Sequence, residues 1–233
     1  MGLRYWIFWF SIVWAQQTLV NLPSIEITHP KRVFVLHESQ IRFWHPEPHW
    51  VTTHFLTYGL SHKVELAVTL HDIGIPRQAY RSLAIGYKCT EDIFARELPE
   101  LELKWALGQM LIVSLSGRRP GLWTYVLWSM RIPHLRTRLS AGINAGPPAL
   151  FGETGHKYPL DLSTIDFIGS IEQPIGEHVN IILEWFSGRH HEFASLIPGL
   201  IVNWKDWTFV LGCRIPNDAE EGISLVTEVG HTF

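Results

Sequence analysis

Residues 64–71 read VELAVTLH, and this stretch decides the fold class. Every second residue from Val64 to Leu70 is apolar, and the positions between hold Glu65, Ala67, Thr69 and His71. Successive side chains of a β-strand point to opposite faces, so a period of two separates an apolar face from a polar one. The stretch therefore predicts a β-strand with one apolar face and one polar face.

The same period recurs along the chain, whereas the 3.6-residue period of an amphipathic helix is almost absent. It is clear in residues 101–108, 135–144, 164–172, 179–185, 207–214 and 223–233. We expect an all-β fold of about twelve strands, with about ten as the alternative, each roughly ten residues long, enough to cross a bilayer when tilted. The expected strands are 32–43, 50–59, 63–73, 79–88, 99–113, 121–131, 135–146, 162–172, 178–187, 193–202, 207–214 and 222–233.

The connections between these strands favour a membrane barrel over a secreted soluble β-sandwich, which would also alternate but turn its apolar face inward. Outer-membrane barrels have short turns on one side and longer loops on the other. Short connections are expected near 60–63, 131–134, 173–177 and 203–206. Longer ones are expected near 44–50, 145–161, 187–193 and 214–221. The connection 89–98 lies on the short-turn side but is longer than this rule predicts.

Aromatic residues gather at the expected strand ends, as two membrane interfaces require. Near the long loops stand Trp44, Trp50, Trp123 and Trp185, and near the short turns stand Tyr58, Trp128, Trp204 and Trp207. With an even number of strands, both termini lie on the short-turn side, which is the periplasm in such barrels.

The amino-acid composition excludes several further classes of protein. Hydrophobic residues make up 46% and charged residues 18%, below the roughly 25% of charged residues in soluble proteins. The net charge of -3 does not favour nucleic acid as a partner. Two cysteines are too few for a disulfide scaffold or a thiolate zinc site.

The N-terminus has the pattern of a signal peptide. Arg4 precedes an apolar run that ends at Ala15, which is too short to cross a bilayer as a helix. We expect residues 1–15 to be removed, residues 16–31 to form an N-terminal periplasmic segment, and residues 32–233 to form one transmembrane β-barrel in a bacterial outer membrane.

Three stretches resemble a known group of proteins: Asn21-Leu22-Pro23-Ser24, YGLSHKVEL at 58–66 and FIGSIEQPIGEHVNIILEWFSG at 167–188. They are similar to hairpins of poorly characterised bacterial outer-membrane barrels. Those are porin-like proteins, loosely akin to barrels associated with phenol-degradation pathways. The resemblance spans most of the chain after residue 15 and implies fold; it transfers no catalytic residue. The terminal Phe233, after an alternating strand, resembles the signal that such barrels present to their assembly machinery, although His231 is polar where that pattern prefers an apolar residue.

The polar face of the strands supplies the candidate site. If it lines a lumen, a basic wall opposes an acidic wall, which would orient small polar solutes in a pore. The alternative is that the charges pair and plug a non-conducting barrel, which then acts structurally or through its external loops. The candidate lumen residues are Glu65, Glu102, Lys104, Arg136, Arg138, Asp166, Glu172, Glu184, Arg214 and Glu228.

Other chemistry has weaker support. The loop histidines of HPEPH (45–49), His156, His190 and His191 have no ligand spacing that specifies a metal, and solvated loop residues are the default. Ser187 lies near His190 and His191 in sequence, but a triad is recognised by geometry. We expect no enzyme activity, no metal and no cofactor; the expected partners are the lipid bilayer, lipopolysaccharide, the barrel-assembly machinery (through Phe233) and small polar solutes. The basic pair Arg118 and Arg119 is a candidate contact for lipopolysaccharide phosphates, and a solvated pair is the default.

Overall fold

The computed structural model describes residues 23–43, 48–71, 81–115, 120–146, 165–187, 195–216 and 222–233. Within these residues the chain forms twelve strands and one short 3-10 helix. They are β1 Val33–Arg42, β2 His49–Gly59, β3 Val64–His71, β4 Ser82–Asp92, η1 Pro99–Leu101, β5 Lys104–Ser114, β6 Gly121–Ile132, β7 Thr137–Ala145, β8 Ile165–Pro174, β9 Val179–Phe186, β10 Ser195–Trp204, β11 Trp207–Pro216 and β12 Ser224–Thr232. No helix in this part of the chain is long and apolar enough to cross a membrane.

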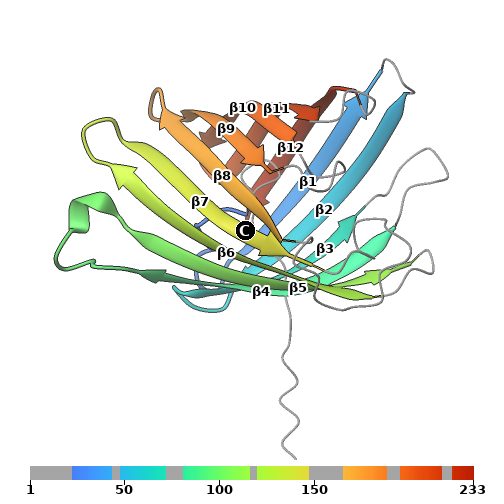
Figure 1. The fold of residues 1–233 in the computed structure, drawn as a ribbon. Coiled ribbons are helices and arrows are strands. Elements are labelled where there is room, and N and C mark those ends of the chain that lie inside the picture. Colours follow the sequence, from blue (N-terminus) through green and yellow to red (C-terminus); the bar gives the residue numbers. More distant parts are fainter. Residues whose placement is uncertain are drawn as a thin grey trace, which may run out of the picture.

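Each strand pairs antiparallel with its neighbour in sequence, and β1 closes the barrel against β12 (Figure 1). At the closing seam Phe34 pairs with Thr232 and Glu38 with Glu228. Closure pairs every strand on both sides and leaves no free sheet edge. The expected all-β barrel is confirmed, with twelve strands.

The expected boundaries of β4, β5 and β7 were wrong. β4 continues to Asp92, and β5 begins at Lys104 instead of near 99, because η1 intervenes. Pro99 has no N–H to donate to a ladder, and Glu102 has a positive φ of 40° that a strand does not allow. Likewise β7 begins at Thr137, and Arg136 lies in the preceding turn with a φ of 55°.

The outward face of the barrel is mostly apolar and exposed. Phe167 is 60% exposed and Leu211 is 50% exposed, which is the reverse of the buried apolar face of a soluble sandwich. A polar exception lies on β1 and β2, where His37 Nδ1 is 3.3 Å from His54 Nδ1. An apolar band around a closed barrel fits the hydrocarbon core of a bilayer.

Aromatic side chains mark both rims of this band, as the sequence predicted. Trp50 and Trp185 lie on the outward face near the long connections, and Trp128, Trp204 and Trp207 lie on it near the short turns. The prediction was wrong for Trp123, which packs against the core inside the barrel. Trp44 lies outside the described residues.

Candidate functional site

Several inward residues of β3, β4 and β5 are small and leave space inside the barrel. Ala67, Ala84 and Ala106 are each no more than 1% exposed. Gly108 lies opposite Tyr125, and a Cβ at this position would be 2.1 Å from the Tyr125 ring. Only glycine therefore lets this ring lie across the lumen.

The N-terminal segment, residues 23–31, enters this space. Ile25 is 3% exposed and packs in one cluster with inward side chains of both walls of the barrel. The chain passes close to β2 on its way in, since a Cβ on Gly59 would lie 2.1 Å from the carbonyl oxygen of His29. The cluster around Ile25 comprises Ala106, Tyr125, Leu127, Ile168, Ile182, Phe186, Ile197, Ile201, Val210 and Val226.

A fully buried ion pair on β3 and β4 holds the segment. Lys88 Nζ lies 2.9 Å from Glu65 Oε1, and both side chains are 0% exposed. Lys88 also donates to the carbonyl oxygens of Ser24, at 3.0 Å, and Glu26. These contacts match the three donors of an ammonium group. Glu65 accepts hydrogen bonds from the backbone N–H of Thr28, at 2.7 Å, and from its hydroxyl, at 3.1 Å.

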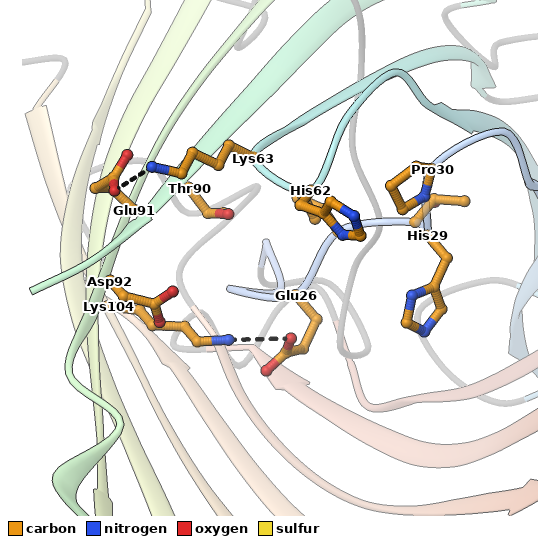
Figure 2. A pocket seen from close by; sticks show the side chains of 11 residues that line it. Glu26, His29, Pro30, His62, Lys63, Thr90, Glu91, Asp92 and Lys104 are labelled. Atoms are coloured by element: carbon orange, nitrogen blue, oxygen red, sulfur yellow. Dashed lines mark hydrogen bonds and ion pairs between the residues drawn. The ribbon is translucent and has the colours of Figure 1, made fainter. Parts of the chain in front are cut away.

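The carboxylate of Glu26 lies in a basic cradle, which we define as Arg138 of β7 and Lys104 of β5. Arg138 Nη1 donates to Glu26 Oε1. Lys104 Nζ lies 3.5 Å from Glu26 Oε2, and Figure 2 marks this contact with a dashed line. Burial by itself would raise the pKa of Glu26, but the charges of Arg138, Lys104 and Lys88 outweigh it and hold that pKa below its usual value of 4.5. Glu26 is therefore a bound carboxylate anion at neutral pH.

Glu102 extends this network at the short-turn end of the barrel. It lies 3.0 Å from Arg131 Nη1 and 3.6 Å from Arg138 Nη2. Arg138 thus bridges one carboxylate of the segment and one of the barrel. Each ion pair with Glu102 is partly exposed, so its own contribution to stability is small.

A pocket of about 160 Å³ opens beside the cradle. Figure 2 shows Lys104 reaching Glu26 and Lys63 reaching Glu91, with His29 and His62 on the other side. Pockets that enclose whole small molecules begin near roughly 300 Å³. This pocket is large enough for water or for the end of a solute, and it gives access to the Glu26 carboxylate, whose side chain is 49% exposed.

The other wall of the lumen carries buried carboxylates on β1, β9 and β12. Glu38 and Glu228 are direct neighbours across the closing seam, and Gln40 donates a 2.7 Å hydrogen bond to Glu38. Glu184 on β9 is 0% exposed. Between Glu184 and Glu228, strands β10 and β11 turn the apolar residues Ile197, Ile201 and Val210 inward.

Most of the expected lumen residues lie on the inward face of a strand. Glu102 lies just after η1 and reaches the lumen network, whereas Arg136 is exposed in the turn before β7. The inward ones are Glu65, Lys104, Arg138, Asp166, Glu172, Glu184, Arg214 and Glu228.

Sequence reasoning missed Lys88, Glu26, Arg131 and Glu38. Lys88 had a usable signal, because it shares a face with Ala84 and Gly86 opposite an apolar face. Glu26 had none, since its segment follows no strand period.

The loop features fall mostly outside the described residues. His45, Glu47, His156, His190, His191, Arg118 and Arg119 all lie there, and the side chain of His49 is also outside the description. Within the described ranges no group of three or more His, Cys, Asp or Glu residues is placed to hold a metal ion. Ser187 accepts a 2.7 Å hydrogen bond from the backbone N–H of Phe167.

Comparisons with known proteins identify the fold. No protein-family model matches the sequence, and no curated protein matches it. The structure is similar to that of a KdgM porin, with a TM-score of 0.57, 9% identity, and coverage of 87% of this chain and 99% of that chain. It is also similar to a KdgM porin in complex with disordered oligogalacturonate, with a TM-score of 0.53, 10% identity, and coverage of 87% and 98%. The chain therefore has the fold of a porin barrel.

Proposed function

We propose that the protein is an outer-membrane channel for small polar solutes, whose inward charges set its selectivity. The observation that carries the proposal is the pairing of two faces on one closed barrel: an exposed apolar band outside and rows of charged side chains inside. A barrel that served only as a membrane anchor would not need buried charges, each of which is costly to remove from water.

The proposed selectivity residues divide into two groups. Lys104, Arg136 and Arg138 form the basic side, with Arg136 at the rim. Arg214 adds a positive charge on β11, between the acidic strands. The acidic residues are Glu65, Glu102, Asp166, Glu172, Glu184 and Glu228. A field across the lumen favours solutes that carry complementary polar groups. One similar porin binds oligogalacturonate, and we propose that this channel also takes a polar solute.

We propose that the chain is exported through residues 1–15 and assembled into the outer membrane through its C-terminal strand. Phe233 is 67% exposed at the short-turn end, where its backbone N–H donates a 2.8 Å hydrogen bond to Val33. That position leaves its ring accessible to an assembly factor. The outward apolar band would contact the lipid bilayer, and the long loops would lie among lipopolysaccharide.

Single-channel recording in planar bilayers tests the channel. We expect discrete currents from the purified, heat-modifiable protein. Under a salt gradient, Glu184→Gln should shift the reversal potential toward anion selectivity and Arg214→Gln should shift it toward cation selectivity. Glu97→Gln, an exposed carboxylate in the β4–β5 connection, is the control and should leave the reversal potential unchanged.

A non-conducting structural barrel is the second candidate, and one observation favours it. Ile197, Val226 and Leu127 point inward from different strands, and each has 0% exposure, so the lumen is filled at their level. Absence of current from a correctly folded barrel, including variants in which the N-terminal segment is released, would establish this candidate and contradict the channel.

A further inference from the structure

We propose that the basic cradle of Arg138 and Lys104 is a carboxylate-binding site in the lumen, which the chain's own Glu26 occupies, and that residues 23–28 form a tethered plug that a carboxylate-bearing ligand loosens by competing for this site. The plug rests on the proposed channel function. The binding site stands on its own geometry.

The cradle has the chemistry of a carboxylate-binding site. A guanidinium and an ammonium from two different strands converge on one carboxylate, with Arg138 on Oε1 and Lys104 on Oε2. Charge-assisted hydrogen bonds of this kind are the strong ones, and arginine is the side chain that best matches a carboxylate. The same two cations would bind a free carboxylate with the same geometry.

A small ligand can approach the cradle from the neighbouring pocket. The Glu26 side chain is 49% exposed, in contrast to the buried Glu65 and Lys88. The pocket lined by Glu26, Thr28 and Lys104 opens next to the cradle. A small carboxylate can therefore reach Lys104 from the short-turn end. Arg138 is 13% exposed and does not line the pocket, so a ligand reaches it only by displacing the Glu26 carboxylate. The Lys88–Glu65 pair is fully buried while the segment is in place.

The N-terminal segment occupies the lumen of the barrel. Ile25 fills the space between the small residues of β5 and the apolar residues of β8 to β12. Its neighbours Glu26 and Thr28 anchor it through the cradle and through Glu65. A ligand that replaces Glu26 in the cradle removes one of the anchors and raises the fraction of time that the lumen is clear of the segment.

Binding of propionate tests the site without reference to channel activity, because propionate is the free equivalent of a glutamate side chain. With the full chain in detergent micelles, NMR titration of ¹³C-labelled propionate should show binding to Glu26→Ala at least about tenfold tighter than to the wild type, the factor for one charge-assisted hydrogen bond. The double variant Glu26→Ala/Arg138→Gln should lose this gain. Equal binding by all three proteins would overturn the site.

Conductance tests the plug. Glu26→Gln should raise the open probability at least about tenfold over the wild type, for the same lost interaction, and Glu97→Gln should not. Propionate should raise the open probability of the wild type when compared with chloride at equal ionic strength. An equal open probability in the wild type and Glu26→Gln would contradict the proposed plug without contradicting the proposed channel. Propionate binding without current in any variant would support the site and contradict the channel.

Discussion

The two walls of the lumen differ in how they hold the N-terminal segment. The wall of β3 to β7 contacts the segment through hydrogen bonds and ion pairs from Glu65, Lys88 and Arg138, in addition to apolar residues of β5 and β6 that share the cluster with Ile25. The wall of β8 to β12 is apolar where it faces Ile25. Apolar burial is strong but non-directional, whereas hydrogen bonds fix position. The apolar wall therefore keeps the segment inside, and the polar wall sets its register.

Breaking the buried pair on the polar wall should have the largest effect. Lys88→Met leaves the Glu65 carboxylate buried without its ammonium partner and should cost about 3–5 kcal/mol of unfolding free energy. Urea unfolding in detergent micelles measures the loss. Lys63→Met is the matched control, because Lys63 is 61% exposed in its pair with Glu91 and should change stability by less than about 1 kcal/mol. Similar losses in both variants would contradict the assigned role of Lys88.

Weakening the contact between the segment and the apolar wall should have an intermediate effect on opening of the segment. Ile25→Ala removes a buried side chain and should make opening of the segment about 2–5 kcal/mol easier. Hydrogen exchange of the amides of residues 23–28 should become faster while the strand amides keep their protection. The control Ile175→Ala, at a position that is 59% exposed, should leave the exchange of both the segment amides and the strand amides unchanged. Unchanged exchange in Ile25→Ala would show that the polar wall alone holds the segment.

Acidification should have the smallest effect and should act on the polar wall. The pKa of Glu26 is lowered in the folded protein, so its contribution is complete above the unfolded value of 4.5 and is lost as the pH falls through the lowered pKa. The charged groups that face Glu26 are Arg138, Lys104, Lys88 and Glu172. After correction for the intrinsic pH dependence of amide exchange, the opening free energy of the segment should therefore fall below this pH in the wild type and stay constant in Glu26→Gln. The same fall in both proteins would assign the effect to another group.

The barrel could be predicted from the sequence because the period of two is local: each strand carries its own apolar and polar faces. The connection through η1 could not be placed from that period, since Leu101 and Leu103 continue the alternation where Pro99 and Glu102 break the ladder.

The occupied lumen could not be predicted at all. The side-chain hydrogen bonds between the segment and the barrel join residues 29 to 112 positions apart in the chain, and no sequence period records such pairs. The period of two could have predicted that Lys88 points inward, but it could not have predicted that Lys88 contacts Glu26. The pattern thus assigns charges to the inward face without showing what they bind there.

The most direct test of the occupied lumen is a reversible lock on the segment. Thr28 Oγ1 and Thr57 Oγ1 are 2.5 Å apart, so Thr28→Cys/Thr57→Cys places two thiols at a separation that suits a disulfide. In a background with Cys89→Ser and Cys213→Ser, the oxidised protein should stay closed in planar bilayers, and reduction should restore the openings of the unlocked protein. Equal currents before and after reduction would contradict a plug formed by this segment.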